Sequence, residues 1–232
     1  MKTLLCIVFF SVVLTVTAQD EFSQFDRRNW TVVLDHPDVN KVTVREHIPY
    51  LSARPGRLPI AVSMPPSLHT GDLRPAIVFL NGSGETAGQP KLKSWGSYKS
   101  WPRLVAAHGF IGISMETDVT RVQESLRSLF TYLNEQGLTY GIDINHLGVY
   151  AASAQVTQSA VYLLGANASK GIKAAVLYYG APPQGPFRKD LPVLFTIAEG
   201  DVGRTNYGSL WNEVLKNNAP WTIKMGTGLP HA

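Results

Sequence analysis

Cysteine is almost absent from this chain of 232 residues, in which Cys6 near the N-terminus is the only one. A disulfide framework or a metal site built on thiolates needs several cysteines, so the sequence excludes both. The histidines do not replace them, because they lack the spacing of metal ligands; they are His36, His47, His69, His108, His146 and His231. We therefore expect no metal and no cofactor.

Long apolar runs are also scarce, and the one clear run lies at the N-terminus. Residues 1–18 have a positive start at Lys2, an apolar core at 4–14 that is too short to span a bilayer comfortably, and small residues ending at Ala18. This pattern predicts a secretory signal peptide, and so a secreted or periplasmic protein without a membrane segment once the peptide is removed. Residues 19–232 have the length of one domain.

Charged residues of one sign do not form clusters in the sequence either. The formal net charge is +4, and Lys and Arg are scattered along the sequence. A nucleic-acid surface needs a basic patch, so we expect no nucleic-acid partner. The sequence does not indicate an oligomeric state.

What the sequence does contain is an alternation of apolar runs and helical patterns, which predicts a mostly parallel sheet with helices on both faces. The first three strands are expected to be antiparallel because turn-rich pieces separate them. Asp118 is a candidate cap for the second helix. The expected strands are 30–34, 41–46, 58–64, 76–80, 111–115, 147–150, 174–179, 193–198 and 222–225, and the expected helices are 98–108, 119–136, 154–164 and 206–217.

The most informative stretch is 144–155, where an apolar strand runs into Ser153 and then into a helical pattern. A nucleophilic serine on a sharp strand-to-helix turn needs small residues two positions to either side. Ala151 meets that requirement and Gln155 does not. A second interpretation of Ser153 is that it only caps the helix that follows.

Together with its lead-in at 142–150, this stretch resembles the nucleophile region of the α/β-hydrolase superfamily, and within it the dienelactone-hydrolase-like and prolyl-oligopeptidase-like esterases. The resemblance extends from about residue 58 to the C-terminus, and the order serine, aspartate, histidine is also the one that the family uses. It implies the α/β-hydrolase fold. Because only about eleven residues at 181–191 join two of the strands, it also implies no cap domain.

The resemblance assigns a catalytic triad. Ser153 corresponds to the nucleophile, Asp201 in a Gly-Asp turn to the acid, and His231 to the general base. Glu199 is the alternative acid, and Asp201 is also compatible with an ordinary turn. A histidine one residue from the chain end would be poorly positioned, so we expect the sequence to continue past Ala232 in a longer protein.

The glycine-rich turn at 81–85 resembles the oxyanion loop of the family. The resemblance implies that the backbone N–H groups of Ser83 and Ala154 bind the oxyanion, while an ordinary glycine-rich turn is the alternative. Aromatic residues near the same edge either form a platform for a sugar or phenolic ring or simply pack; they are Trp95, Tyr98, Trp101, Tyr207 and Trp211.

The sequence therefore predicts a serine hydrolase that cleaves carboxylic esters through an acyl-enzyme. Without a cap domain, its site would accept small-molecule or polymer-linked esters. A hydrolase-fold protein that has lost catalysis and acts as a secreted binding module is the alternative, favoured by Gln155 and Asn81.

Overall fold

The computed structural model describes residues 34–50, 58–80, 94–117, 120–201 and 207–228. The expected signal peptide, most of the first expected strand, Ser83 and His231 lie outside these ranges. The described residues form an eight-stranded sheet in the order β1-β2-β4-β3-β5-β6-β7-β8. Its strands are β1 Thr43–Tyr50, β2 Leu58–Met64, β3 Arg74–Leu80, β4 Ile111–Met115, β5 Ile142–Ala152, β6 Ile172–Tyr178, β7 Val193–Ala198 and β8 Trp221–Gly226.

One strand near the edge of the sheet, β2, runs opposite to all the others. The β1–β2 and β2–β4 pairs are antiparallel, whereas every pair from β4 through β3 to β8 is parallel. The expected antiparallel start and parallel remainder are therefore confirmed for the described strands. Parallel strands have their carboxyl ends at one edge of the sheet, where ligand sites form in folds of this kind.

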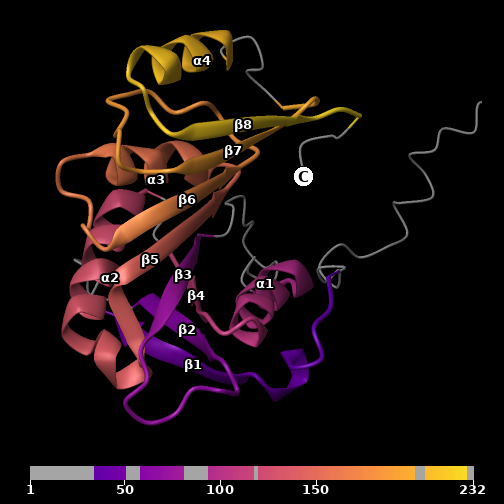
Figure 1. The fold of residues 1–232 in the computed structure, drawn as a ribbon, viewed down its shortest axis with the longest axis vertical. Helices are drawn as coiled ribbons and strands as arrows, with labels where there is room; N and C mark the ends of the chain where they lie inside the picture. Colours follow the sequence, from indigo (N-terminus) through magenta and orange to yellow (C-terminus); the bar gives the residue numbers. More distant parts are fainter. Residues whose placement is uncertain (1–33, 51–57, 81–93, 118–119, 202–206, 229–232) are drawn as a thin grey trace, which may run out of the picture.

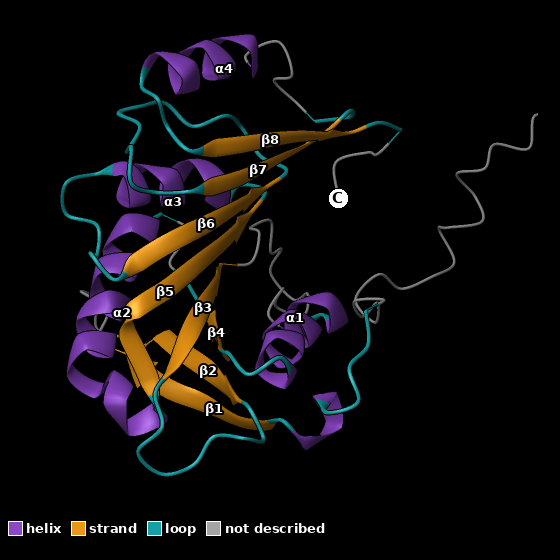
Figure 2. Ribbon diagram, viewed as in Figure 1, coloured by secondary structure: helices purple, strands orange, loops and turns teal. Residues whose placement is uncertain are grey.

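Helices cover both faces of the sheet, as Figures 1 and 2 show. The α1 helix (Gly96–Ala107) lies on one face, and α2 (Val122–Gln136) and α3 (Gln155–Leu164) lie together on the other. The α4 helix (Tyr207–Lys216) precedes the edge strand β8. Two 3-10 turns, Val39–Lys41 and Gly137–Tyr140, complete the described elements. None of the helices in the described ranges is both long and apolar enough to cross a membrane.

The α2 helix shows why the helical pattern could be recognised. Its apolar residues recur every three or four positions, so they share one face that packs on the sheet. All five positions that form this pattern are buried, namely Val122, Leu126, Leu129, Phe130 and Leu133. The expected helix start was wrong, since α2 begins at Val122 with Arg121 as its N-cap. Asp118, the expected cap, lies outside the described residues.

A short connection leaves the carboxyl edge of the sheet uncovered by any inserted domain. Strand β6 ends at Tyr178, β7 begins at Val193, and the residues between them contain no helix or strand. Within the described part of the chain, the expectation of no cap domain is therefore confirmed.

Candidate active site

Ser153 occupies a strained turn between β5 and α3. Its φ is 54°, in the left-handed region that residues with a Cβ rarely adopt. The turn is fixed on both sides: the Ser153 N–H donates to the carbonyl of Tyr178 at 3.0 Å, and its own carbonyl accepts from the N–H of Val156 at 3.0 Å. Backbone strain of this kind persists where the surrounding structure enforces it, and it concentrates at functional sites.

The helix-cap interpretation of Ser153 does not fit this geometry. The α3 helix begins at Gln155, and the N-cap position belongs to Ala154, which has no side-chain oxygen. Ser153 therefore stands one residue before the cap. The Ala154 N–H lies at the start of α3, where the first N–H groups of a helix lack intrahelical acceptors.

Small residues surround the turn, as the sequence pattern requires. Ala151 on the preceding strand is fully buried. Gly180, after β6, lies so close that a Cβ there would stand 2.5 Å from the Ser153 carbonyl oxygen and 2.7 Å from the Val156 side chain. The sequence analysis did not single out Gly180; its position directly after a predicted strand was the available indication.

Gln155, which departs from the usual small residue, is buried beside the turn. Its Nε2 donates to the Thr117 hydroxyl at 3.2 Å, which links the serine turn to the end of β4. Its Oε1 is buried and has no hydrogen-bond partner among the residues that the structure describes. The larger side chain is thus accommodated by a contact with β4.

Asp201 is the better placed of the two candidate acids. It is buried after β7, and its Oδ2 accepts from the Ala198 N–H at 2.7 Å. Glu199 is exposed, and its Oε2 accepts from the Gly228 N–H at 2.6 Å. Glu199 therefore joins the turns after β7 and β8, while Asp201 is directed into the protein.

Ser153 and Asp201 follow strands that are separated only by β6. Adjacent strands lie about 4.8 Å apart, so the two turns are about 10 Å apart. An imidazole between them would be in reach of both. Gly228, the last described residue, lies against Glu199 at the same edge of the sheet, and the expected base, His231, lies outside the described residues.

Tyrosines that the sequence analysis did not assign to the triad surround this gap. Tyr179 has a φ of 31° and neighbours Tyr98 on α1. Burial, and then the neighbouring Tyr98, raise the pKa of Tyr179. Tyr207 donates to the Gly180 carbonyl at 3.0 Å, and burial and the nearby Asp201 carboxylate raise the pKa of Tyr207 to about 12.

The residues of the expected aromatic platform lie in different environments. Trp95 stacks on Tyr98 with ring centroids 6.1 Å apart. Tyr207 is buried against Phe195, and Trp211 on α4 is exposed. Within the described ranges, no group of three or more His, Cys, Asp or Glu side chains is arranged to hold a metal ion.

Comparison with known proteins locates this arrangement among solved folds. No protein-family model and no curated protein matches the chain. A thermophilic esterase of Thermogutta terrifontis, Est2 with propionate bound, superposes with a TM-score of 0.66 at 14% identity, over 84% of this chain and 86% of that one. The same esterase phosphoramylated by tabun gives a TM-score of 0.67 at 14% identity, over 88% of each chain.

A larger protein shares the same architecture. A dipeptidyl aminopeptidase IV-like protein of Bacteroides ovatus matches with a TM-score of 0.62 at 11% identity, and the match covers 82% of this chain but 33% of that one. The sheet order, the strained serine turn and these similarities agree with one another. The chain therefore has the α/β-hydrolase fold, of the kind found in esterases and in dipeptidyl-peptidase-like proteins.

Proposed function

We propose that this protein is a serine hydrolase that cleaves carboxylic esters through an acyl-enzyme. The observation that carries the proposal is Ser153, held at a φ of 54° on the turn between β5 and α3. This backbone presents a serine hydroxyl at the carboxyl edge of the sheet, where a nucleophile of this fold acts. The buried carboxylate of Asp201, two strands away, supports the same assignment.

The proposed reaction has two halves. The Ser153 hydroxyl attacks the ester carbonyl carbon while His231 accepts its proton, and the resulting oxyanion binds the N–H groups of Ala154 and Ser83. The carbon–oxygen bond to the alcohol then breaks, and His231 returns the proton to the leaving oxygen. Water, activated by the same histidine, releases the carboxylic acid and restores Ser153.

Asp201 has a supporting role in both halves. A buried carboxylate beside an imidazole fixes its tautomer and stabilises the imidazolium that forms when the serine proton is taken. The hydrogen bond from the Ala198 N–H at 2.7 Å holds the Asp201 carboxylate in place for this task. The exposed Glu199, bonded to the next turn, is not assigned to it.

The structural neighbours agree with a nucleophilic serine. The Thermogutta terrifontis esterase is described with propionate bound and, in other structures, phosphorylated by paraoxon. Because identity is 14 to 15%, the substrate of that enzyme is not transferred to this chain. We further propose that the protein acts outside the cytoplasm after removal of residues 1–18, on a small or polymer-linked ester.

Hydrolysis of p-nitrophenyl acetate by the purified protein tests the proposal. We expect turnover that falls at least a thousandfold in Ser153→Ala and in His231→Gln, and strongly in Asp201→Asn, whereas Glu199→Gln retains most of it. Absence of turnover in the parent protein would contradict the proposal and favour the inactive binding module.

A further inference from the structure

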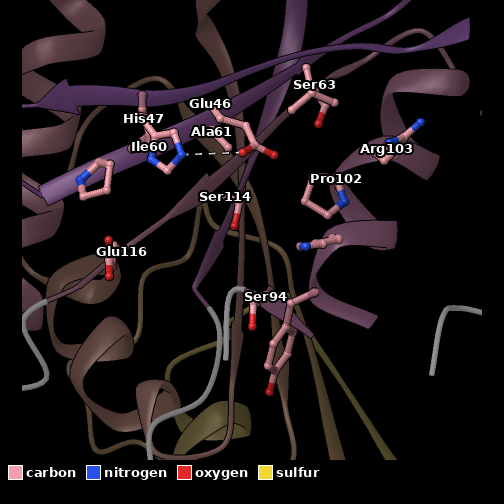
Figure 3. A pocket seen from close by; sticks show the side chains of 14 residues that line it. Glu46, His47, Ile60, Ala61, Ser63, Ser94, Pro102, Arg103, Ser114 and Glu116 are labelled. Carbon is pink, nitrogen blue, oxygen red and sulfur yellow. Dashed lines mark ion pairs between the residues drawn. The ribbon is translucent and has the colours of Figure 1, made fainter. Parts of the chain in front are cut away.

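A cavity of about 300 Å³ lies between α1 and the strands β1, β2 and β4. Figure 3 shows Glu46, Ser63 and Ser114 on the strand side and Pro102 and Arg103 on the helix side. Ligand pockets range from about 300 to 1,000 Å³, so this one holds a single small group. Of the proposed catalytic residues that the structure describes, neither Ser153 nor Asp201 lines it.

Two connections join this cavity to the serine turn. Tyr98 lines the cavity and neighbours Tyr179, the residue before the Gly180 that packs on Ser153. Glu116 also lines it, and the next residue, Thr117, accepts a hydrogen bond from Gln155 at 3.2 Å. The cavity wall is therefore linked through these side chains to the residues that pack around Ser153.

A bulge shapes the strand wall of the cavity. The register between β1 and β2 shifts between Arg45 and Ile48, and His47 within the shift has a φ of 56°. A bulge redirects side chains and is frequent next to binding sites. Here both residues of the bulge, Glu46 and His47, line the cavity, with 3.7 Å between the Glu46 carboxylate and the His47 Nε2.

Charges on the two walls balance each other. Lys99 and Arg103, one turn apart on α1, face the same cavity as Glu46 and Glu116. An anionic ligand would meet two carboxylates, and a cationic one would meet two basic side chains. A purely apolar ligand would have to displace water from all four charged groups, which is costly.

A neutral ligand with many hydroxyls fits every part of this wall. A hydroxyl donates to a carboxylate and accepts from an ammonium or guanidinium group, and hydrogen bonds to charged groups are stronger than those between neutral groups. The Tyr98 ring and the apolar floor, which includes Ile60 and Ala61, suit the C–H face of a sugar ring.

We propose that this cavity binds a neutral sugar ring, as the part of an ester substrate next to the bond that Ser153 cleaves. The proposal rests on the hydrolase function above. It assigns the substrate class as acylated carbohydrates, and it makes Glu46 and Lys99 specificity-determining residues. Both are on the exposed rim of the cavity, so their replacement should leave folding intact.

Calorimetric titration of the full chain with methyl β-D-glucopyranoside, succinate and choline tests the binding. We expect the glucoside to bind and the two charged probes not to bind. Glu46→Gln and Lys99→Met should each raise the dissociation constant for the glucoside about tenfold. The matched controls Glu135→Gln and Lys216→Met, exposed on α2 and α4, should not change it. Equal binding by variants and controls, or preferential binding of succinate or choline, would overturn the proposal.

A kinetic comparison separates the effect of the cavity on substrate preference from the effect of the catalytic residues on the rate. The ratio of kcat/KM for an acetylated methyl glucoside to that for p-nitrophenyl acetate should fall about tenfold in Glu46→Gln and stay constant in Glu135→Gln. An unchanged ratio in Glu46→Gln would contradict the role of the cavity. Glucoside binding without turnover of either ester would support the cavity and contradict the hydrolase function.

Discussion

The carbonyl oxygen of Ser153 and the α-carbon of Gly180 are packed so closely that no side chain fits between them. An added Cβ at Gly180 would lie 2.5 Å from that oxygen and 2.7 Å from Val156. The carboxyl ends of β5 and β6 are thus in close backbone contact at the serine turn. The N–H of Ser153, which donates to the Tyr178 carbonyl at 3.0 Å, adds a hydrogen bond to this contact.

Gly180→Ala should therefore displace the serine turn. The clash is with backbone, which cannot rotate away, so we expect a loss of about 1–3 kcal/mol in the free energy of unfolding. A shift of about an ångström at the nucleophile also predicts roughly a hundredfold lower kcat. Urea denaturation and ester hydrolysis measure the two effects.

Gly208→Ala is the matched control, because a Cβ there meets nothing within 4 Å. Gly208 lies in α4, so the replacement should leave the hydrolysis rate unchanged and stabilise the protein slightly. Similar effects of the two substitutions would contradict the close contact at Gly180.

Two replacements of Ser153 separate the cost of backbone strain to stability from the role of the hydroxyl in catalysis. Ser153→Gly and Ser153→Ala both remove the hydroxyl, but only glycine adopts a φ of 54° without a Cβ penalty. We expect Ser153→Gly to be about 0.5–1 kcal/mol more stable than Ser153→Ala, with neither variant active. A more stable alanine variant in urea denaturation would argue against a strained turn.

The sequence predicted the architecture well where the apolar pattern is regular. The strands Leu58–Met64, Ile111–Met115 and Val193–Ala198 have the predicted bounds, because each begins and ends with an apolar residue and only one polar residue interrupts it. Strand β5 was predicted at 147–150 but spans Ile142–Ala152. Its first part carries Asn145 and His146, which are exposed and so interrupt the apolar run without ending the strand.

The site was predicted less completely. The positions of Ser153 and Asp201 after β5 and β7 agree with the sequence interpretation, whereas His231 and Ser83 lie outside the described residues. Tyr179 and Tyr98 are neighbours, which brings a strand end close to a helix far away in sequence. Such a contact follows from how strands and helices assemble, which local patterns do not specify.

Tyr207 predicts a dependence of stability on pH. Burial and Asp201 raise its pKa in the folded protein to about 12, whereas an unfolded tyrosine ionises near pH 10. The stabilisation is therefore complete below about pH 10 and is lost as the pH rises toward 12, since the unfolded chain releases the proton first. Tyr207→Phe should make the unfolding free energy fall less between pH 9.5 and 11.5.

The same variant tests the hydrogen bond to Gly180. At pH 7, Tyr207→Phe should lower the free energy of unfolding by about 1 kcal/mol, because the 3.0 Å bond to the Gly180 carbonyl is lost. Urea denaturation at both ends of the pH range gives the two results together. A parallel pH profile in the parent and the variant would contradict the raised pKa.

Two replacements of Gln155 distinguish how much its volume and its polar group each contribute to the free energy of unfolding. Gln155→Ala leaves a buried cavity and removes the bond to Thr117, so we expect a loss of about 2 kcal/mol. Gln155→Met keeps the length and removes the buried Oε1, which has no partner in the described part of the chain, so the loss should be below about 1 kcal/mol. Equal losses for the two variants would show that the space around this side chain closes up.

The most direct test of the central claim is covalent labelling of the purified protein with a fluorophosphonate, followed by peptide mass spectrometry. Ser153 on its strained turn should carry the adduct, and Ser153→Ala should not be labelled. The buried Ser159, on the following helix, serves as an internal control and should remain unmodified. No adduct, or an adduct on a serine other than Ser153, would contradict the assignment of this protein as a serine hydrolase acting through Ser153.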